Sequence, residues 1–222
     1  MEHLATIVAA LVGATLGSLG AEWLRNRFQQ QSDADRTRRE VAQKHLIQLQ
    51  DALESLYFRL TNVSDWGGLS VMTKPYYELS SIYAIGNVLA QKRRLMLDGI
   101  YALLDTQGPA FPGDLESKLE AIEASIGNEW TSSVSFFRYE RLALAESLLI
   151  WDGVWRTVTY AEFLGLTTES SFEQVLEPAR KFFERLDAAQ IEQIRTRLLE
   201  ALEMVVRHTG IRPPAGVATA TV

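Results

Sequence analysis

Arg39 and His45 are the residues of this chain whose types and spacing come nearest to a catalytic pair. An arginine can stabilise the charge of a phosphate, and a histidine can act as a general acid or base. Together they would suit cleavage of a phosphodiester. The alternative interpretation is a surface histidine on a helix, with no chemistry attached.

The spacing of Arg39 and His45 resembles the arginine–histidine spacing of HEPN-type ribonucleases, which are also helical. That spacing is common, and here it falls at the start of the first predicted bundle helix, beside the predicted membrane segment. We therefore expect a protein that is not an enzyme. The alternative function is a membrane-anchored effector, either an oligomeric pore or a HEPN-like ribonuclease, in stress or phage defence.

A second set of polar residues lies on strongly apolar predicted helices: Arg59, Asn62, Arg138, Arg141 and Glu146. A buried charge is costly unless it is paired, so these residues could form a polar pocket between the first and fourth bundle helices. The alternatives are a structural salt-bridge network or charges that face solvent, as is usual on amphipathic helices. Glu116, Glu120 and Glu123 could bind a cation, but their spacing is typical of a solvated helix face.

The composition excludes several classes of site. The chain has 222 residues, of which 47% are hydrophobic and 23% charged, as in a globular protein. It has no cysteine, which excludes disulfides, thiol catalysis and thiolate metal sites. The three histidines form no local metal motif, so we expect no metal and no cofactor. A net charge of −6 argues against nucleic acid as a partner.

The N-terminal segment predicts a membrane anchor. The 18 residues from Leu4 to Ala21 carry no charge, and as a helix they would extend about 27 Å, close to the thickness of a bilayer core. Arg25 and Arg27 follow, which places the C-terminal side in the cytoplasm. We expect residues 1–24 to be a single transmembrane helix in the cell membrane. The alternatives are a signal peptide, for which a basic start is missing, and a packed helix of a soluble protein.

Small residues recur at helical spacing within this segment: Ala10, Gly13, Ala14, Gly17, Ser18 and Ala21. In a soluble helix each glycine would cost about 1 kcal/mol, whereas in lipid small residues let two helices approach closely. The stripe therefore predicts self-association of the chain in the membrane as a homo-oligomer.

The rest of the chain predicts an all-α fold. Residues 25–40 form a polar connector, either solvated or in contact with anionic lipid. Residues 41–210 are expected to form a cytoplasmic bundle of about five helices, and residues 211–222 a disordered tail. The first bundle helix has an apolar seam with alternating spacings of four and three residues: Ala42, Leu46, Leu49, Leu53, Leu56, Leu60 and Val63.

Further signals predict where the helices begin and end. A second helix is expected from Pro75 to about residue 105, and another over residues 132–150. Asp187 suits the N-cap of the last helix, and Gly210 its end. Residues 154–158 could be extended, but no second strand-like segment is evident, so no sheet is expected. The tryptophans near the turns, among them Trp151, could form an exposed binding patch but are expected to seal the core.

Three stretches carry a family resemblance: residues 56–63, 83–95 and 136–149. The matching residues are Arg59, Leu60 and Asn62, then Tyr83, then Phe137, Arg138 and Glu146. Over residues 45–205 the chain resembles a family of bacterial helical proteins, often preceded by one membrane segment, for which no activity is established. The aromatic run expected after Asn87 is missing. The resemblance implies a helical fold and no reaction, which leaves a membrane-tethered interaction module with a protein partner as the expected function.

Overall fold

The computed structural model describes residues 2–65, 75–104, 111–127 and 136–211. Of residues 2–32 it describes the helical backbone and, among the side chains, only that of Gln29. The chain separates into unit 1, residues 1–41, and unit 2, residues 42–222, and helix α1 (Glu2–Asp65) contributes to both. In unit 1 the side chains from residue 33 to residue 41 are exposed, and Arg36 pairs with Glu40 at 2.9 Å.

The predicted transmembrane helix and its stripe of small residues fall where the side chains lie outside the described residues. Among the residues that are described, no helix combines the length and the apolar character that crossing a bilayer requires. The membrane anchor therefore stays a prediction from the sequence.

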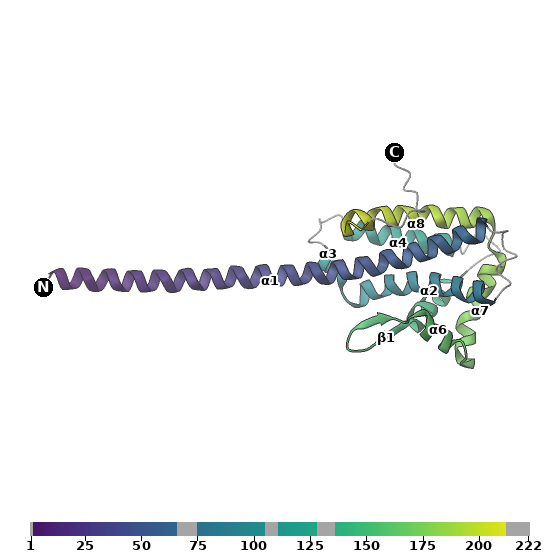
Figure 1. Ribbon diagram of the computed structural model, residues 1–222, viewed down its shortest axis with the longest axis horizontal. Helices are drawn as coiled ribbons and strands as arrows, with labels where there is room; N and C mark the ends of the chain where they lie inside the picture. The colour runs from purple at the N-terminus through teal and green to yellow at the C-terminus, as the bar shows by residue number, and fades with distance from the viewer. Residues whose placement is uncertain (1, 66–74, 105–110, 128–135, 212–222) are drawn as a thin grey trace. The chain divides into compact units, whose positions relative to one another are not determined.

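Unit 2 is a helical bundle with one small hairpin (Figure 1). After α1 it contains α2 (Pro75–Leu97), α3 (Ile100–Leu104), α4 (Phe111–Ile126), α5 (Arg138–Ser147), β1 (Leu149–Trp151), β2 (Trp155–Thr157), α6 (Tyr160–Leu166), α7 (Ser170–Arg185) and α8 (Ala188–Thr209). The all-α prediction is confirmed. The described part has eight helices instead of about five, partly because Gly99 adopts a left-handed conformation (φ +63°) and divides the helix expected over residues 75–105.

The predicted apolar seam of α1 is confirmed, since all seven of its residues are at most 1% exposed. Helix α8 lies beside α1, although the two helices come from opposite ends of the chain (Figure 1). The Thr209 hydroxyl donates to the side-chain oxygen of Gln50 at 2.7 Å, and the Gln50 amide donates to the carbonyl of Ile211 at 3.1 Å. These bonds satisfy polar groups of α1 that the packing of α8 removes from water.

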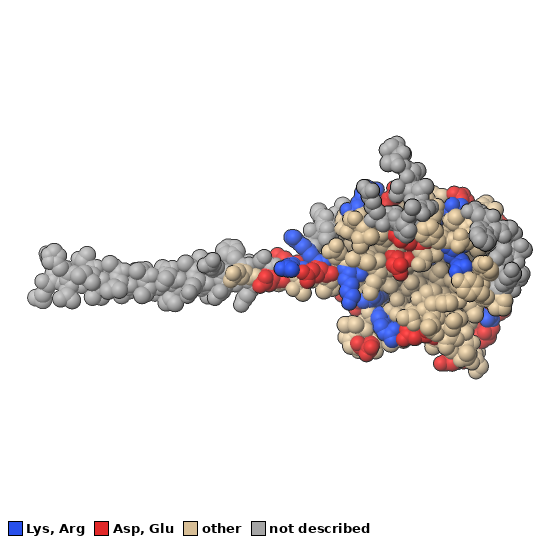
Figure 2. All heavy atoms as spheres, viewed as in Figure 1, with Lys and Arg blue, Asp and Glu red and all other residues tan. Residues whose placement is uncertain are grey.

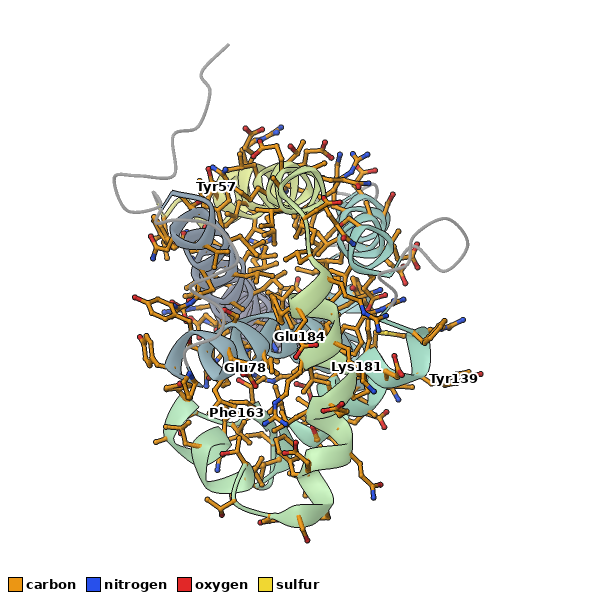
Figure 3. The ribbon with its side chains drawn as sticks, turned by 90° about the vertical axis from the view of Figure 1, so that its right-hand side faces the viewer. Tyr57, Glu78, Tyr139, Phe163, Lys181 and Glu184 are labelled. Atoms are coloured by element: carbon orange, nitrogen blue, oxygen red, sulfur yellow. The ribbon has the colours of Figure 1, made fainter. Side chains whose placement is uncertain are left out.

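Helix α2 lies in the middle of the unit and contacts the elements that follow it. Tyr83 of α2 packs against Phe163 of α6, with 5.4 Å between the ring centroids, and Phe163 in turn meets Phe172 of α7 at 6.0 Å. Figure 3 shows Phe163 among these helices, in contrast to Tyr139, which points away from the protein. The Tyr83 hydroxyl donates to the carbonyl of Val158 at 2.9 Å, so burial of the ring leaves its polar end satisfied.

The prediction that no sheet forms is wrong. Residues 149–151 pair antiparallel with residues 155–157, and Trp151 lies opposite Trp155. The turn between them uses Gly153, whose φ of +73° is favourable only for glycine. The partner strand comes from the end of the helix predicted over residues 132–150, because α5 stops at Ser147 and the apolar residues after it are extended.

A capping arrangement joins the hairpin to α6. Glu162 accepts a hydrogen bond from the backbone N–H of Thr159, the N-cap residue, at 2.7 Å. The same carboxylate accepts two hydrogen bonds from Arg156 of β2, each of 2.9 Å. The bonds from Arg156, followed by that from Thr159, lower the pKa of Glu162 to about 2. The base of the hairpin is thus fixed to the first turn of α6 by a bidentate ion pair.

Both predicted ends of α8 are confirmed. The Asp187 carboxylate accepts from the backbone N–H of Gln190 at 2.8 Å, and Gly210 closes the helix with a φ of +69°. We expect Asp187→Ala to lower the free energy of unfolding by about 1 kcal/mol, because an N–H of the first turn loses its acceptor. Chemical denaturation measures this difference. Asp187→Asn keeps an acceptor oxygen and should retain most of the stability, so equal losses in the two variants would contradict the capping role.

Charges of both signs are spread over the face of unit 2 shown in Figure 2. Basic and acidic side chains alternate there with uncharged ones and do not separate by sign. Several charges pair across elements, as Lys118 of α4 does with Glu200 of α8 at 2.7 Å. A mixed surface of this kind supplies little long-range attraction for a polyanion, in line with the net charge.

Candidate functional site

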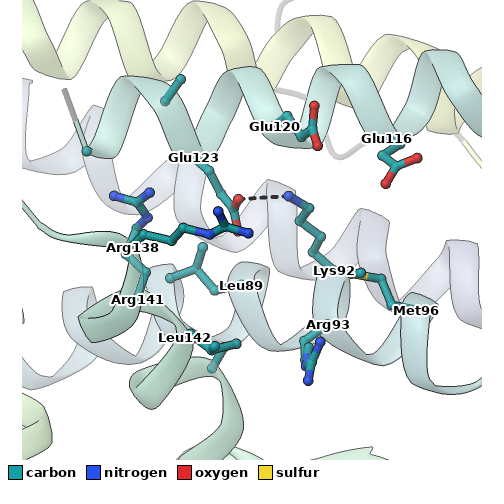
Figure 4. A pocket seen from close by; sticks show the side chains of 13 residues that line it. Leu89, Lys92, Arg93, Met96, Glu116, Glu120, Glu123, Arg138, Arg141 and Leu142 are labelled. Atoms are coloured by element: carbon teal, nitrogen blue, oxygen red, sulfur yellow. Dashed lines mark hydrogen bonds and ion pairs between the residues drawn. The ribbon is translucent and has the colours of Figure 1, made fainter. Parts of the chain in front are cut away.

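A cavity of about 480 Å³ lies between α2, α4 and α5 (Figure 4). This volume is within the range of sites that bind small molecules. Its apolar lining includes Leu89, Met96, Leu142 and Ala145. Its lining also carries seven charged side chains: Lys92, Arg93, Arg138, Arg141, Glu116, Glu120 and Glu123. The cavity therefore combines an apolar surface with charges of both signs.

Helical periodicity positions the charged side chains. Glu116, Glu120 and Glu123 follow one another at intervals of four and three residues, so α4 presents all three on one face. Arg138 and Arg141 are three residues apart in the first turns of α5. The predicted solvated face of α4 is thus one wall of the cavity, since α2 and α5 pack beside it.

An ion pair between buried Lys92 and partly exposed Glu123 spans the cavity between α2 and α4. The Lys92 ammonium lies 2.7 Å from a carboxylate oxygen of Glu123, and Lys92 is only 9% exposed. Removing a lysine charge from water costs several kcal/mol unless a partner compensates it. The pair therefore fixes the separation of the two helices at the centre of the cavity.

Arg141 occupies a corner of the cavity that depends on Gly127. Its guanidinium donates a hydrogen bond to the carbonyl of Phe136, and Arg141 is 7% exposed. A Cβ atom on Gly127 would lie 2.6 Å from the guanidinium carbon and 2.7 Å from the Phe136 carbonyl oxygen. Only a residue without a side chain leaves room for the arginine at this position.

Tyr101 of α3 lies close to the acidic wall. Burial and, after it, the charges of Glu116, Glu120 and Glu123 raise the pKa of the Tyr101 hydroxyl. The hydroxyl is buried and has no hydrogen-bond partner among the described residues. Glu116, Glu120 and Glu123 therefore place acidic side chains along one wall of the cavity.

The structure divides the five residues of the predicted polar network. Arg138 and Arg141 line the cavity, and Glu146 pairs at 3.0 Å with Arg93, which also lines it. Arg59 lies elsewhere, with its guanidinium 5.4 Å from the ring centroid of Tyr76. Asn62 is exposed.

Sequence reasoning did not select Lys92 and Arg93 as site residues, nor did it place the three α4 glutamates at a binding site. The signal for the basic pair was the run Lys92-Arg93-Arg94 on a helix that is otherwise rich in apolar residues. A charged run on such a helix requires acidic partners from other elements. Which elements supply them depends on the tertiary fold.

His45 is buried against α2 and its C-terminal end, at 6% exposure. Its Nε2 lies 3.6 Å from Asp98, whose carboxylate also accepts from Arg94 at 3.2 Å. Arg39, by contrast, is exposed and belongs to unit 1. A general acid or base must reach its substrate, so this position favours a structural role for the histidine over the ribonuclease interpretation.

The environment of His45 predicts a pH-dependent stability. Burial, and next the charge of Arg94, lower the pKa of His45 to about 4 from its ordinary value of 6.5; Lys44 acts in the same direction and Asp98 against it. The unfolded chain therefore binds a proton at a higher pH than the folded chain, and stability falls as the pH decreases through this window. We expect the free energy of unfolding to fall by about 2 kcal/mol between about pH 7 and about pH 5 from this group alone.

Urea denaturation over this pH range, with His45→Gln for comparison, tests the prediction. The variant lacks the titrating group, so its stability should vary less with pH than that of the original chain. Parallel pH profiles for the two proteins would show that His45 titrates normally in the folded state.

The hairpin forms a second candidate surface. Trp151 is 60% exposed and Val154 at the turn is 63% exposed. The ring of Trp155 packs edge-on against that of Trp151, with 5.2 Å between the centroids. The expectation that Trp151 seals the core is therefore wrong. The turn lifts this side chain away from the bundle, and tryptophan in such a position is typical of binding surfaces.

The stretches that carry the family resemblance fall on α1, α2 and α5, and they do not form a single site. Arg59 contacts aromatic rings, Tyr83 bonds to the backbone of Val158, and Arg138 lines the cavity. Comparison of the chain with protein-family models, with curated proteins and with solved structures found no match.

Proposed function

We propose that this protein is a membrane-tethered helical interaction module. In this proposal the N-terminal segment anchors the chain by a single span, and its small-residue stripe brings copies together. Unit 2 lies in the cytoplasm and binds a protein partner. The uncharged residues 4–21 and the following Arg25 and Arg27 support the anchor and its orientation.

The exposed hairpin is the observation that supports partner binding. Trp151 and Val154 present apolar surface to solvent, while the ion pair of Arg156 with Glu162 fixes the base of the hairpin. A side chain that is already held in place loses little conformational entropy on binding, and tryptophan is enriched at the centres of interfaces. The hairpin is therefore suited to insert into an apolar groove of another protein.

Carbonate extraction of membranes tests the anchor. Cells would produce the full chain and, separately, a chain that begins at Gln29. We expect the full chain to resist extraction and the shortened chain to be released. Release of both chains would refute the tether and, with it, the proposed self-association in the membrane.

Chemical cross-linking in membranes tests self-association. Replacing Gly13 and Gly17 together with leucine would fill the stripe, so cross-linked oligomers should decrease. Replacing Leu11 and Leu16 together with alanine is the control, because both positions lie outside the stripe. Unchanged oligomers in the glycine variant would refute the role of the stripe.

Site-directed photo-cross-linking tests the binding surface. A benzophenone side chain at position 151 should give one discrete heterologous product in cells, and Val154→Ser should diminish it. The same probe at position 76 is the matched control, because Tyr76 has the same 60% exposure but lies on α2. Equal labelling from both positions would indicate random encounter and would contradict a hairpin interface.

A further inference from the structure

Apart from Arg93, which pairs with Glu146 at 3.0 Å, the charges of the cavity are arranged by sign along its length. Figure 4 shows Glu116 and Glu120 to one side of the Lys92–Glu123 ion pair, and Arg138 and Arg141 to the other. The cavity therefore has an acidic end and a basic end. The central pair is already neutralised by its own contact of 2.7 Å, so it does not determine the charge of a ligand.

Each end suits a different ionic group. At the basic end, Arg141 is held in its corner by the Phe136 carbonyl, and Arg138 adds a second, exposed guanidinium. Guanidinium groups bind carboxylates with strong, directional hydrogen bonds. At the acidic end, Glu116 and Glu120 line the cavity one helical turn apart on α4. Two carboxylates favour an ammonium group.

The length of the cavity limits the ligand. Gly127 lies next to the Arg141 guanidinium. Glu120 and Gly127 are seven residues apart, on α4 and the turn at its C-terminal end. At 1.5 Å per residue this is about 10 Å, which an extended peptide of about three residues would span. Between the ends, Leu89 and Leu142 provide an apolar surface for a central side chain.

We propose that this cavity binds a short peptide with both ends free, with its carboxylate beside Arg138 and Arg141 and its ammonium beside Glu116 and Glu120. A ligand with a single charge would match only one of the two ends of the cavity. The proposal is independent of the membrane anchor and of the hairpin surface, because none of the residues that it uses belongs to the N-terminal segment or to the hairpin.

Calorimetric titration of the full chain, purified in a non-ionic detergent, tests the proposal with the tripeptide Ala-Leu-Ala. The two comparison peptides are its N-acetylated form, which lacks the ammonium, and its C-amidated form, which lacks the carboxylate. We expect the free tripeptide to bind and each modification to weaken binding by about tenfold or more. Absence of binding by the free tripeptide would overturn the proposal. Equal binding of the acetylated peptide would also overturn it, in favour of a simple anion site.

Two variants assign the ends. Arg138→Gln should weaken binding of the free tripeptide but should not weaken binding of the amidated peptide further, because both changes remove the same contact. Likewise, Glu120→Gln should weaken binding of the free tripeptide but should not weaken binding of the acetylated peptide further. Both residues are exposed, so folding should be preserved, and circular dichroism would check it. The controls are Arg207→Gln and Glu184→Gln, exposed changes of equal charge away from the cavity. If the variant and peptide effects added independently, the assigned ends would be wrong.

Discussion

Replacing Leu53 with alanine is expected to lower the free energy of unfolding by about 3–5 kcal/mol, which is a large part of the stability of an ordinary domain. Leu53 is at the centre of the seam of α1 and is 0% exposed. The substitution removes apolar contacts and leaves a cavity that the surrounding helices can only partly close. Chemical denaturation followed by circular dichroism measures the loss.

Ile47→Ala on the same helix is the matched control. Ile47 is 39% exposed, and alanine has the higher helix propensity, so the stability should change by less than about 1 kcal/mol. Comparable losses in the two variants would mean that burial of the seam does not hold α1 to the bundle. A small loss for Leu53→Ala alone would mean that the bundle repacks freely around this position.

Gly127→Ala is expected to cost about 3 kcal/mol through a single added methyl group. The new Cβ would lie 2.7 Å from the carbonyl oxygen of Phe136, which belongs to the backbone and cannot rotate away. It would also displace the guanidinium of Arg141 and break its bond to that carbonyl. A buried charge would then lose a hydrogen bond at the same time as the backbone is forced apart.

The control is Gly113→Ala, in the first turn of α4, the helix that Gly127 directly follows. A Cβ on Gly113 would meet no atom within 4 Å, and alanine favours the helix, so this variant should be unchanged or slightly more stable. Thermal unfolding distinguishes the two substitutions. If Gly127→Ala were as stable as Gly113→Ala, Arg141 would have another position of similar energy, and the basic end of the cavity would not be preformed.

The sequence predicted the elements that depend on local or periodic signals. The seam of α1 was correct because a helix in a bundle buries one continuous face, and its spacing is directly visible in the residues from Ala42 to Val63. The ends of α8 were correct because a cap uses only residues within one turn of the helix end, here Asp187 and Gly210.

The hairpin could not be predicted in the same way. The run Leu148-Leu149-Ile150 is compatible with a helix, and the sequence before it is strongly helical. Its extended conformation depends on pairing with residues 155–157 and on a hydrogen bond from the Val158 N–H to the Leu148 carbonyl at 2.9 Å. Tertiary packing here overrides the local preference, as is common for short apolar segments.

The candidate site was predicted only in part, for a related reason. Arg138 and Arg141 were predicted to belong to a polar site because they interrupt an apolar helix, and both line the cavity. Their relation to Glu120 and to the Lys92–Glu123 pair depends on three helices meeting. Lys92 and Glu123 are 31 residues apart, and no periodicity within either helix connects them. The charge of a helix face can be predicted from the sequence, but the element that packs against that face cannot.

The hydrogen bond between Gln50 and Thr209 has a consequence for the order of events during synthesis. The two residues are 159 positions apart, so at ordinary translation rates the ribosome needs on the order of 10–30 s to add the second after the first. For that time the leucines of α1 that face α8 have emerged without the helix that covers them. The packing of α8 on α1 is therefore completed only when translation is nearly finished.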